Sequence, residues 1–301
     1  MSNYIVFDIG GSSVKWSIMN EVGEIIKKDK IKVADTVERF FSGLINTVII
    51  NKNKYDLKGI AISSPGAVDR KTGIVGGASA IPYIHGPNFK EILKESTQLD
   101  VSIENDANCA ALGECWLGAA KEVNDCAFVV CGSGIGGAIV KDKRIHAGVH
   151  KHGGEFGYCI VDYNEDNDEK YLTWSRVGST TALARSIAIR KGIQEDEIDG
   201  LKAFKLSDEG DEVAREEVDK YFRYMAIGIY NIQYTFDPEI IVLGGAISER
   251  ENYIEKVNEK LHDIFSGNTD GKVKPIIKKC VYGNDANMIG ALYNFLNERK
   301  A

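Results

Sequence analysis

The sequence predicts an α/β protein with two domains. The chain has 301 residues, and because domains usually contain roughly 100–200 residues, this length suits two of them. Short apolar runs rich in Val, Ile and Phe alternate with helical stretches along the whole chain, as α/β proteins require. Each half also opens with a strand, a glycine turn and a second strand. This repetition indicates a duplicated unit with a cleft between the two copies.

The first half alternates between strand and helix patterns. The apolar run Tyr4–Asp8 (YIVFD) predicts a buried strand, Gly10 and Gly11 predict a turn, and Val14–Met19 predicts a second strand. The next turn falls at Glu21–Glu24 (EVGE). Further along we predict helices over Glu38–Lys52, Phe89–Thr97 and Ala107–Gly118, and strands over Leu57–Ser63 and Val101–Glu104.

The second half repeats this logic. The run CAFVVC predicts a strand, the following glycine-rich segment Gly132–Gly137 predicts a turn, and AIVK predicts another strand. A later apolar strand ends at Gly244-Gly245. The polar and acidic segment Asp162–Lys170 (DYNEDNDEK) predicts an exposed loop. The strands predicted in this half are Cys126–Cys131, Ala138–Lys141 and Ile240–Leu243.

The composition is typical of a soluble globular protein. Apolar residues make up 44% of the chain and charged residues 27%, which excludes disordered, collagen-like and coiled-coil proteins. The net charge is −7, so binding to nucleic acid, which needs a dense basic surface, is disfavoured as the main role. The chain shows no signal-peptide pattern and no apolar run of roughly 18 residues, so we expect a cytoplasmic protein outside the membrane.

The six cysteines form no C-x-x-C pair. This spacing argues against a disulfide framework and against a thiolate metal site. We expect small buried thiols at all six positions. They are Cys109, Cys115, Cys126, Cys131, Cys159 and Cys280.

The glycine segments are the first functional signal. Gly132–Gly137 (GSGIGG) formally satisfies the dinucleotide-binding pattern G-x-G-x-x-G, but that pattern needs a helix at the glycines, and the following AIVKDKRI indicates a strand and hairpin. No segment matches the P-loop pattern G-x-x-x-x-G-K-[ST]. Two glycine turns remain, at Gly10–Ser13 and Gly132–Gly137, each between two strands. For either turn alone, a tight hairpin is the plainer interpretation.

Together, two such turns are suited to binding phosphate groups. Main-chain N–H groups approach phosphate oxygens closely where no Cβ intervenes. Asp8, at the end of the first strand, is placed to hold Mg²⁺ directly or through water, and Lys15 could add a positive charge near the phosphates.

Two further acidic positions stand at ends of elements or in loops. Glu104–Asn108 (ENDAN) lies where a strand ends and a helix begins, so Asn105 or Asp106 either caps the helix or belongs to a site. Glu155 lies among the glycines of Gly148–Tyr158 (GVHKHGGEFGY), where it could bind polyol hydroxyls or simply face solvent.

Taken together, these motifs resemble the ROK family of sugar kinases and repressors. Their order and spacing match from residue 4 to about residue 295. The motifs are Asp8–Lys15 (DIGGSSVK), Ser64–Gly66 (SPG), Glu104–Glu114 (ENDANCAALGE), Gly132–Gly137, Gly153–Gly157 (GGEFG), Val242–Ala246 (VLGGA) and Asn284–Ala291 (NDANMIGA).

The resemblance implies an actin-like, ribonuclease-H-like ATPase fold with two domains hinged about a cleft. It implies an N-terminal α/β domain over residues 1–118, joined by a C-terminal helix over residues 287–301, and a C-terminal α/β domain over residues 119–286. It also implies a homodimer that uses ATP and Mg²⁺ to phosphorylate a sugar hydroxyl, with O6 expected. Closure of the domains on the sugar would exclude water.

Roles for single residues follow from the same resemblance. Asp106 would be the general base, because a sugar hydroxyl is a poor nucleophile and a carboxylate must accept its proton. Asn105 and Glu155 would bind sugar hydroxyls, Gly66 would line the sugar pocket, and Tyr158 stands where many relatives carry a sugar-binding His. The residues facing ATP and Mg²⁺ would be Asp8 (also the metal ligand), Gly10, Gly11, Ser12, Lys15, Gly132, Ser133, Gly134, Gly136, Gly244 and Gly245.

The sequence departs from the family at its structural zinc motif. Many members carry E-x-G-H followed by C-x-C-G-x-x-G-C-x-E, but this chain retains only Cys159 in that stretch, so we expect no zinc site. The spacing H-x-x-x-H-x-H of His146, His150 and His152 is a weak metal signal in a glycine-rich loop.

Loss of this motif also changes the expected sugar pocket. Its final Glu, a sugar contact in zinc-bearing relatives, aligns with Ser175, which could leave room for a substituent at the anomeric carbon. The chain would then resemble the zinc-less β-glucoside kinases and accept sugars such as cellobiose. Tyr83 and His85 either stack on a second sugar ring or pack within their loop.

Other functions remain open at this point. A glucokinase or an N-acetylmannosamine kinase would act on the free hexose instead. A family repressor would need a helix-turn-helix domain before the phosphate strand, which begins here at Tyr4. A sugar-sensing regulator without turnover is the remaining non-enzyme alternative, since a filament-forming actin relative would not need the sugar motifs.

Overall fold

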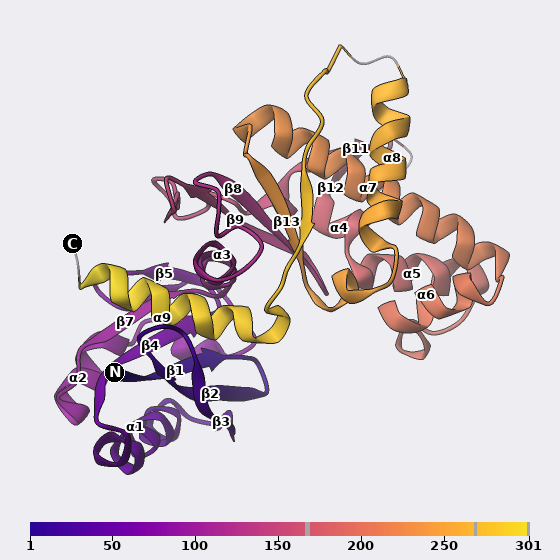
Figure 1. Cartoon of the computed structure of the whole chain (residues 1–301). Coiled ribbons are helices and arrows are strands. Elements are labelled where there is room, and N and C mark those ends of the chain that lie inside the picture. The colour runs from indigo at the N-terminus through magenta and orange to yellow at the C-terminus, as the bar shows by residue number, and fades with distance from the viewer. Residues whose placement is uncertain (166–168, 268–269, 300–301) are drawn as a thin grey trace. The chain divides into compact units, whose positions relative to one another are not determined.

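The computed structural model describes residues 1–165, 169–267 and 270–299 (Figure 1). The chain folds into two compact units. Each unit has its own sheet and its own apolar core, so the predicted α/β class is confirmed. The N-terminal unit consists of Met1–Lys121, Ala147–His152 and Asn284–Ala301, and the C-terminal unit consists of Glu122–His146 and Gly153–Gly283.

A sheet of five strands organises the N-terminal unit. Its members are β1 (Asn3–Ile9), β2 (Ser13–Asn20), β3 (Ile25–Lys32), β4 (Leu57–Ser64) and β7 (Val101–Asn105). They lie in the order β3-β2-β1-β4-β7, with β1, β2 and β3 antiparallel and β1, β4 and β7 parallel. The carboxyl ends of β1, β4 and β7 therefore share one edge of the sheet. A small hairpin of β5 (Ala67–Asp69) and β6 (Ile74–Gly76) follows β4.

Helices cover both faces of this sheet. They are α1 (Val37–Tyr55), α2 (Phe89–Thr97), α3 (Asp106–Trp116) and α9 (Ala286–Glu298), with a short 3-10 helix η1 (Pro82–Ile84). Successive side chains of a strand point to opposite faces. In β1, Ile5 and Phe7 join the core formed with α1 and α2, whereas Tyr4 packs on Phe295 of α9 with ring centroids 5.3 Å apart. By this alternation Asp8 lies on the face covered by α9, the yellow helix in Figure 1.

Helices α3 and α9 pack closely because glycine lies at their contact. A Cβ on Gly290 of α9 would lie 1.6 Å from the carbonyl oxygen of Cys109. A Cβ on Gly113 of α3 would lie 2.5 Å from the carbonyl oxygen of Ala286. Only glycine permits this approach, and it brings the last helix of the chain against the helix that begins at Asp106.

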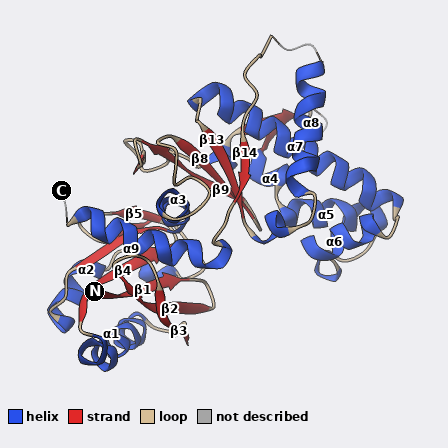
Figure 2. Ribbon diagram, in the orientation of Figure 1, coloured by secondary structure: helices blue, strands red, loops and turns tan. Residues whose placement is uncertain are grey.

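The C-terminal unit repeats the plan. Its five-stranded sheet has the order β10-β9-β8-β13-β14, again with an antiparallel part (β8, β9 and β10) and a parallel part (β8, β13 and β14) (Figure 2). Both halves of the chain thus open with the predicted strand, turn and strand. The strands are β8 (Cys126–Cys131), β9 (Ile135–Lys141), β10 (Arg144–Ile145), β13 (Ile240–Gly244) and β14 (Ile277–Lys279).

The remaining elements complete this unit. Its helices are α4 (Trp174–Gly178), α5 (Thr180–Lys191), α6 (Gly200–Asp208), α7 (Glu212–Phe236) and α8 (Tyr253–Ser266), and a hairpin consists of β11 (Ile160–Tyr163) and β12 (Tyr171–Thr173). Short 3-10 helices are η2 (Phe156–Tyr158), η3 (Glu195–Glu197) and η4 (Ala246–Glu249), and η5 (Gly283–Asp285) leads back to the N-terminal unit. Among the described residues, none of the helices is both long and apolar enough to span a membrane.

Three sequence-based expectations need correction. The exposed loop predicted over Asp162–Lys170 begins later, because Asp162 and Tyr163 pair with β12, and residues 166–168 of that segment lie outside the described residues. The turn predicted over Gly132–Gly137 is shorter, because β9 already begins at Ile135. Cys159 is exposed, whereas the other cysteines are buried as predicted.

Candidate functional site

Asp8 is the first predicted site residue, and it lies at the carboxyl end of β1. Its side chain is almost buried, with the residue 7% exposed. The Ser63 hydroxyl and the Asn287 amide donate to its Oδ1 at 2.9 and 3.1 Å. Lys15 faces Asp8 across the β1–β2 pair, and its Nζ lies 3.6 Å from Oδ2.

The predicted turn directly follows this strand. Gly10 closes it by donating its N–H to the carbonyl of Ser13 at 3.1 Å. Gly10, Gly11 and Ser12 are exposed, and a Cβ on Gly11 would lie only 3.0 Å from Ala80. The turn therefore presents main-chain groups next to Asp8 with little side-chain cover.

The start of α3 holds the next two predicted residues. Asn105 is the N-cap: its Oδ1 accepts from the N–H of Asn108 at 3.1 Å, and its Nδ2 donates to the carbonyl of Gly66 at 3.1 Å. Asp106 is the first residue of the helix and accepts the N–H of Ala107 at 2.8 Å. A helix N-terminus stabilises a carboxylate in its first turn. Asn105 therefore caps α3 and also binds the main chain of Gly66, the residue predicted to line the sugar pocket.

Gly66 needs to be glycine at this position. Its φ is +97°, and a Cβ would lie 2.8 Å from the carbonyl oxygen of Gly76 and 3.1 Å from the His85 ring. His85 is held here by hydrogen bonds to Ser79 Oγ at 2.9 Å and to the Gly76 carbonyl at 3.2 Å. The Tyr83 hydroxyl instead donates to the Ala34 carbonyl. Of the two aromatic residues singled out in the sequence, His85 therefore lies beside Gly66, and Tyr83 binds the loop at Ala34.

The charges of three carboxylates act on one buried thiol in this unit. Burial raises the pKa of Cys109 well above its usual value, and the charges of Glu104, Asp8 and Asp106 raise it further. Cys109 is fully buried in α3. The predicted metal ligand Asp8 and the predicted base Asp106 lie at the carboxyl ends of β1 and β7, which share one edge of the sheet with β4 between them.

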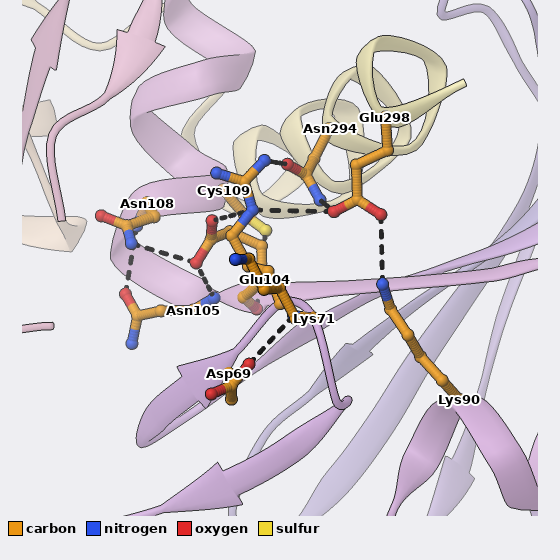
Figure 3. A network of polar contacts seen from close by, with 10 residues as sticks. Asp69, Lys71, Lys90, Glu104, Asn105, Asn108, Cys109, Asn294 and Glu298 are labelled. Atoms are coloured by element: carbon orange, nitrogen blue, oxygen red, sulfur yellow. Dashed lines mark hydrogen bonds and ion pairs between the residues drawn. The ribbon is translucent and has the colours of Figure 1, made fainter. Parts of the chain in front are cut away.

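Glu104 belongs to the ENDAN motif, but the sequence predicts no role of its own for it. It is 3% exposed, and its Oε1 accepts from the N–H of Asn105 at 2.7 Å and from Asn108 Nδ2 at 3.1 Å (Figure 3). Burial raises the pKa of Glu104, and the Arg70 guanidinium acts in the opposite direction. The one available signal was its place as the last carboxylate of a buried strand.

In the C-terminal unit, residues from the first turns of α4 and α5 hold the turn after β8 by hydrogen bonds. The carbonyl of Gly132 accepts the N–H of Thr180 at 3.0 Å and its hydroxyl at 2.7 Å. Ser175 accepts the N–H of Ile135 at 2.9 Å and donates to the same residue's carbonyl at 3.1 Å. Gly132, Ser133 and Gly134 form the turn, whereas Gly136 lies in β9 opposite Val130.

The second glycine pair adjoins this turn. Strand β13 lies parallel to β8, with Gly244 opposite Val130. Gly245 has φ +94°, and a Cβ there would lie 2.0 Å from the carbonyl oxygen of Cys131. Gly245, one of the predicted adenosine-side glycines, therefore packs against Cys131, the residue directly before the second phosphate turn.

A cavity of about 440 Å³ opens beside the turn. It brings together Ser133 with Glu155 and Tyr158, two of the predicted sugar-binding residues, and Tyr158 is 73% exposed. Its volume is in the range of small-molecule sites. Its other lining residues are Ile135, Gly157, Thr173, Ser175, Arg176, Ser179, Thr181, Ala182 and Arg185.

The histidines of the predicted weak metal signal do not gather with other ligands. The ring Nδ1 of His152 lies 2.7 Å from the carbonyl oxygen of His150, within the loop itself. Over residues 1–165, 169–267 and 270–299, no group of three or more His, Cys, Asp or Glu side chains is arranged to hold a metal ion.

Comparison with known proteins gives a consistent picture. The model of the ROK family matches residues 4–298. A β-glucoside kinase of Listeria monocytogenes is 33% identical, with 97% of both chains covered, and a glucokinase of Halalkalibacterium halodurans is 30% identical, with 95% of this chain and 93% of the relative covered. The crystal structure of a ROK family protein from Streptococcus pneumoniae in complex with sucrose superposes with a TM-score of 0.90 at 37% identity, covering 99% of both chains.

Proposed function

The chain belongs to the ROK family, and we propose that it transfers a phosphoryl group from ATP to a hydroxyl of a glucose unit, O6 being expected. Its fold is the actin-like ATPase fold of that family. One observation carries the proposal: Asp8, Gly66 and the Asn105-Asp106 pair lie at or just beyond the carboxyl ends of three adjacent parallel strands, β1, β4 and β7, at one edge of the sheet. Phosphoryl transfer needs alignment and charge neutralisation, with a carboxylate to accept the hydroxyl proton.

Asp106 accepts the proton in this proposal. As the bond from the sugar oxygen to phosphorus forms, the hydroxyl proton passes to the Asp106 carboxylate, which the start of α3 holds in place. Asn105, tied to the Gly66 carbonyl at 3.1 Å, orients the neighbouring hydroxyl group. In the C-terminal unit, Glu155 and Tyr158 bind further sugar hydroxyls.

The glycine turns and Asp8 serve the nucleotide. The turn at Gly10–Ser12 and the turn at Gly132–Gly134 offer main-chain N–H groups to phosphate oxygens, Lys15 adds charge, and Gly244-Gly245 lies beside the adenosine. Asp8 fits Mg²⁺: both protein donors bind Oδ1, so Oδ2, which lies 3.6 Å from Lys15 Nζ, is the oxygen that would coordinate a hard cation. When bound, Mg²⁺ neutralises phosphate charge.

The substrate class that we propose is a β-glucoside such as cellobiose. Ser175, where zinc-bearing relatives would place a sugar-binding Glu, uses its hydroxyl on Ile135 instead. Relatives from Listeria monocytogenes and Klebsiella pneumoniae are named β-glucoside kinases, and the similar Streptococcus pneumoniae structure holds sucrose, a disaccharide. The second candidate is a glucokinase acting on free hexose, favoured by the glucokinase relative at 30% identity.

A coupled assay of ADP release over a sugar panel tests both candidates. With cellobiose, other β-glucosides, glucose and N-acetylmannosamine, we expect kcat/KM to be highest for a β-glucoside, by about tenfold over glucose. A clear preference for glucose would replace the first candidate with the second. Absence of turnover with every sugar would leave a sensor role.

We also propose a homodimer in the cytoplasm, on family membership alone. Light scattering coupled to gel filtration should give the mass of two chains. The mass of one chain would contradict this assembly.

A further inference from the structure

The buried carboxylate of Glu104 joins the start of α3 to Arg70. Its Oε1 receives the N–H of Asn105 and the Asn108 side chain, and its Oε2 lies 3.2 Å from Arg70 Nε. A buried carboxylate is costly unless donors and a cation compensate it. These three partners therefore hold the Glu104 carboxylate in place, and the carboxylate in turn restricts the positions of Asn105, Asn108 and Arg70.

Arg70 connects Glu104 to the last helix of the chain. Its guanidinium donates to Asn294 Oδ1 at 2.7 Å, and its Nε lies 3.6 Å from Glu298 Oε1. Asn294 Nδ2 also donates to Glu298 Oε1 at 3.1 Å. Lys90 of α2 completes the cluster at 3.2 Å from Glu298 Oε2 (Figure 3). Two carboxylates and two cations thus balance, and the cluster joins β7, α2 and α9.

The contacts of Glu104 converge on the residues that carry the proposed chemistry. The hydrogen bond at 2.7 Å holds the peptide just before Asn105, and Asn108 is bound both by Glu104 and by the Asn105 cap. These contacts set the direction of the first turn of α3, where Asp106 lies. In catalysis, a displacement of about 1 Å in a positioned group can cost about 100-fold in rate.

We propose that Glu104 and Arg70 are positioning residues, which hold Asn105 and Asp106 in the geometry for phosphoryl transfer by tying the start of α3 to α9. This inference rests on the proposed kinase function. Neither residue contacts the sugar or ATP in this proposal. The C-terminal part of α9 holds Arg70 in place through Asn294 and Glu298.

The test compares Glu104→Gln, Glu104→Ala and Arg70→Met. Glu104→Gln keeps an oxygen that can accept from Asn105 and Asn108, so we expect kcat to stay within about threefold of wild type. Glu104→Ala removes that acceptor, and Arg70→Met leaves the buried carboxylate without its cation. For both we expect kcat to fall by about tenfold or more, with KM for ATP unchanged.

Asp100→Asn is the matched control. Asp100 forms an exposed ion pair with Lys94 at 2.9 Å in the same unit, away from α3, so kcat should not change. Activity is measured per folded molecule, well below each variant's Tm. If Glu104→Ala does not fold, the ranking of Glu104→Gln above Arg70→Met carries the test.

The outcomes separate the two proposals. A wild-type protein without sugar-dependent ADP release contradicts the kinase function itself. A wild-type protein with turnover whose Glu104→Ala and Arg70→Met variants lose Tm but keep kcat within twofold of wild type overturns the positioning role and leaves a structural one. A fall in kcat in Glu104→Ala and Arg70→Met, together with a nearly wild-type kcat in Glu104→Gln, supports the positioning role.

Discussion

Asn287 Nδ2 donates a hydrogen bond to Asp8 Oδ1 at 3.1 Å, which joins the last helix of the chain to its first strand. Asp8 shares this oxygen with the Ser63 hydroxyl, so two neutral donors hold the carboxylate in one orientation. The predicted metal ligand is therefore oriented by residues from β4 and α9.

Replacing Asn287 with Ala should weaken this orientation. A hydrogen bond to a charged group contributes about 1.5–3 kcal/mol, so we expect kcat to fall by about tenfold and the Mg²⁺ concentration at half-maximal rate to rise. A Mg²⁺ titration of ADP release measures both quantities. An unchanged Mg²⁺ dependence would show that Asn287 does not act through Asp8.

Gly290→Ala should destabilise the N-terminal unit. The added Cβ would lie 1.6 Å from the Cys109 carbonyl oxygen, so α9 must move away from α3. We expect a loss of at least about 1–3 kcal/mol in the free energy of unfolding, measured by urea denaturation. The control is Gly43→Ala in α1, where the nearest atom is at 3.5 Å and the change should be neutral or slightly stabilising. Equal effects of the two substitutions would contradict the packing argument.

Gly245→Ala should weaken ATP binding selectively. Its Cβ would lie 2.0 Å from the Cys131 carbonyl oxygen, at the base of the Gly132 turn. We expect KM for ATP to rise by about tenfold while KM for the sugar stays the same. Gly192→Ala is the control, because its φ of +66° gives similar strain with no atom within 4 Å. A rise in KM for the sugar alone would reverse the assignment of these glycines.

Asp69 should titrate far below an ordinary Asp. Hydrogen bonding from Lys151 lowers the pKa of Asp69 from 3.8 to about 2. Because the folded value is depressed, this contact stabilises the folded chain above pH about 4, and its contribution is lost as the pH falls toward 2. An NMR titration of the carboxyl carbon measures this, and Lys151→Met should return the midpoint toward 3.8. A wild-type midpoint near 3.8 would show that the segment 147–152 is not held by this pair.

Local sequence patterns predicted most elements well. The strand Cys126–Cys131 and the helix Phe89–Thr97 have the predicted bounds, because an apolar run and an N-cap (Asn88) define them locally. The start of β9 was misplaced because glycine usually signals a turn. Gly137 instead lies within β9, where close packing requires a glycine, because a Cβ would lie 2.5 Å from both the Phe128 carbonyl oxygen and the Phe156 ring.

Candidate site residues could be proposed from the sequence where they are neighbours along the chain, whereas contacts between distant residues could not be predicted. Asn105 and Asp106 stand out because a strand end meets a helix start. The link from Glu104 through Arg70 to Glu298 is set by tertiary packing, and no spacing in the sequence indicates it. The role of Asn287 was missed for the same reason: its partner Asp8 lies at the other end of the chain.

The Asp106→Asn variant tests the central claim most directly. Asparagine keeps the size and an oxygen acceptor for the Ala107 N–H but cannot accept the hydroxyl proton as a base. We predict that kcat for sugar-dependent ADP release falls by about 10²–10⁴-fold, while calorimetry shows sugar binding within a few-fold of wild type. Turnover near the wild-type rate in a variant that binds the sugar normally would contradict the assignment of Asp106 as the general base.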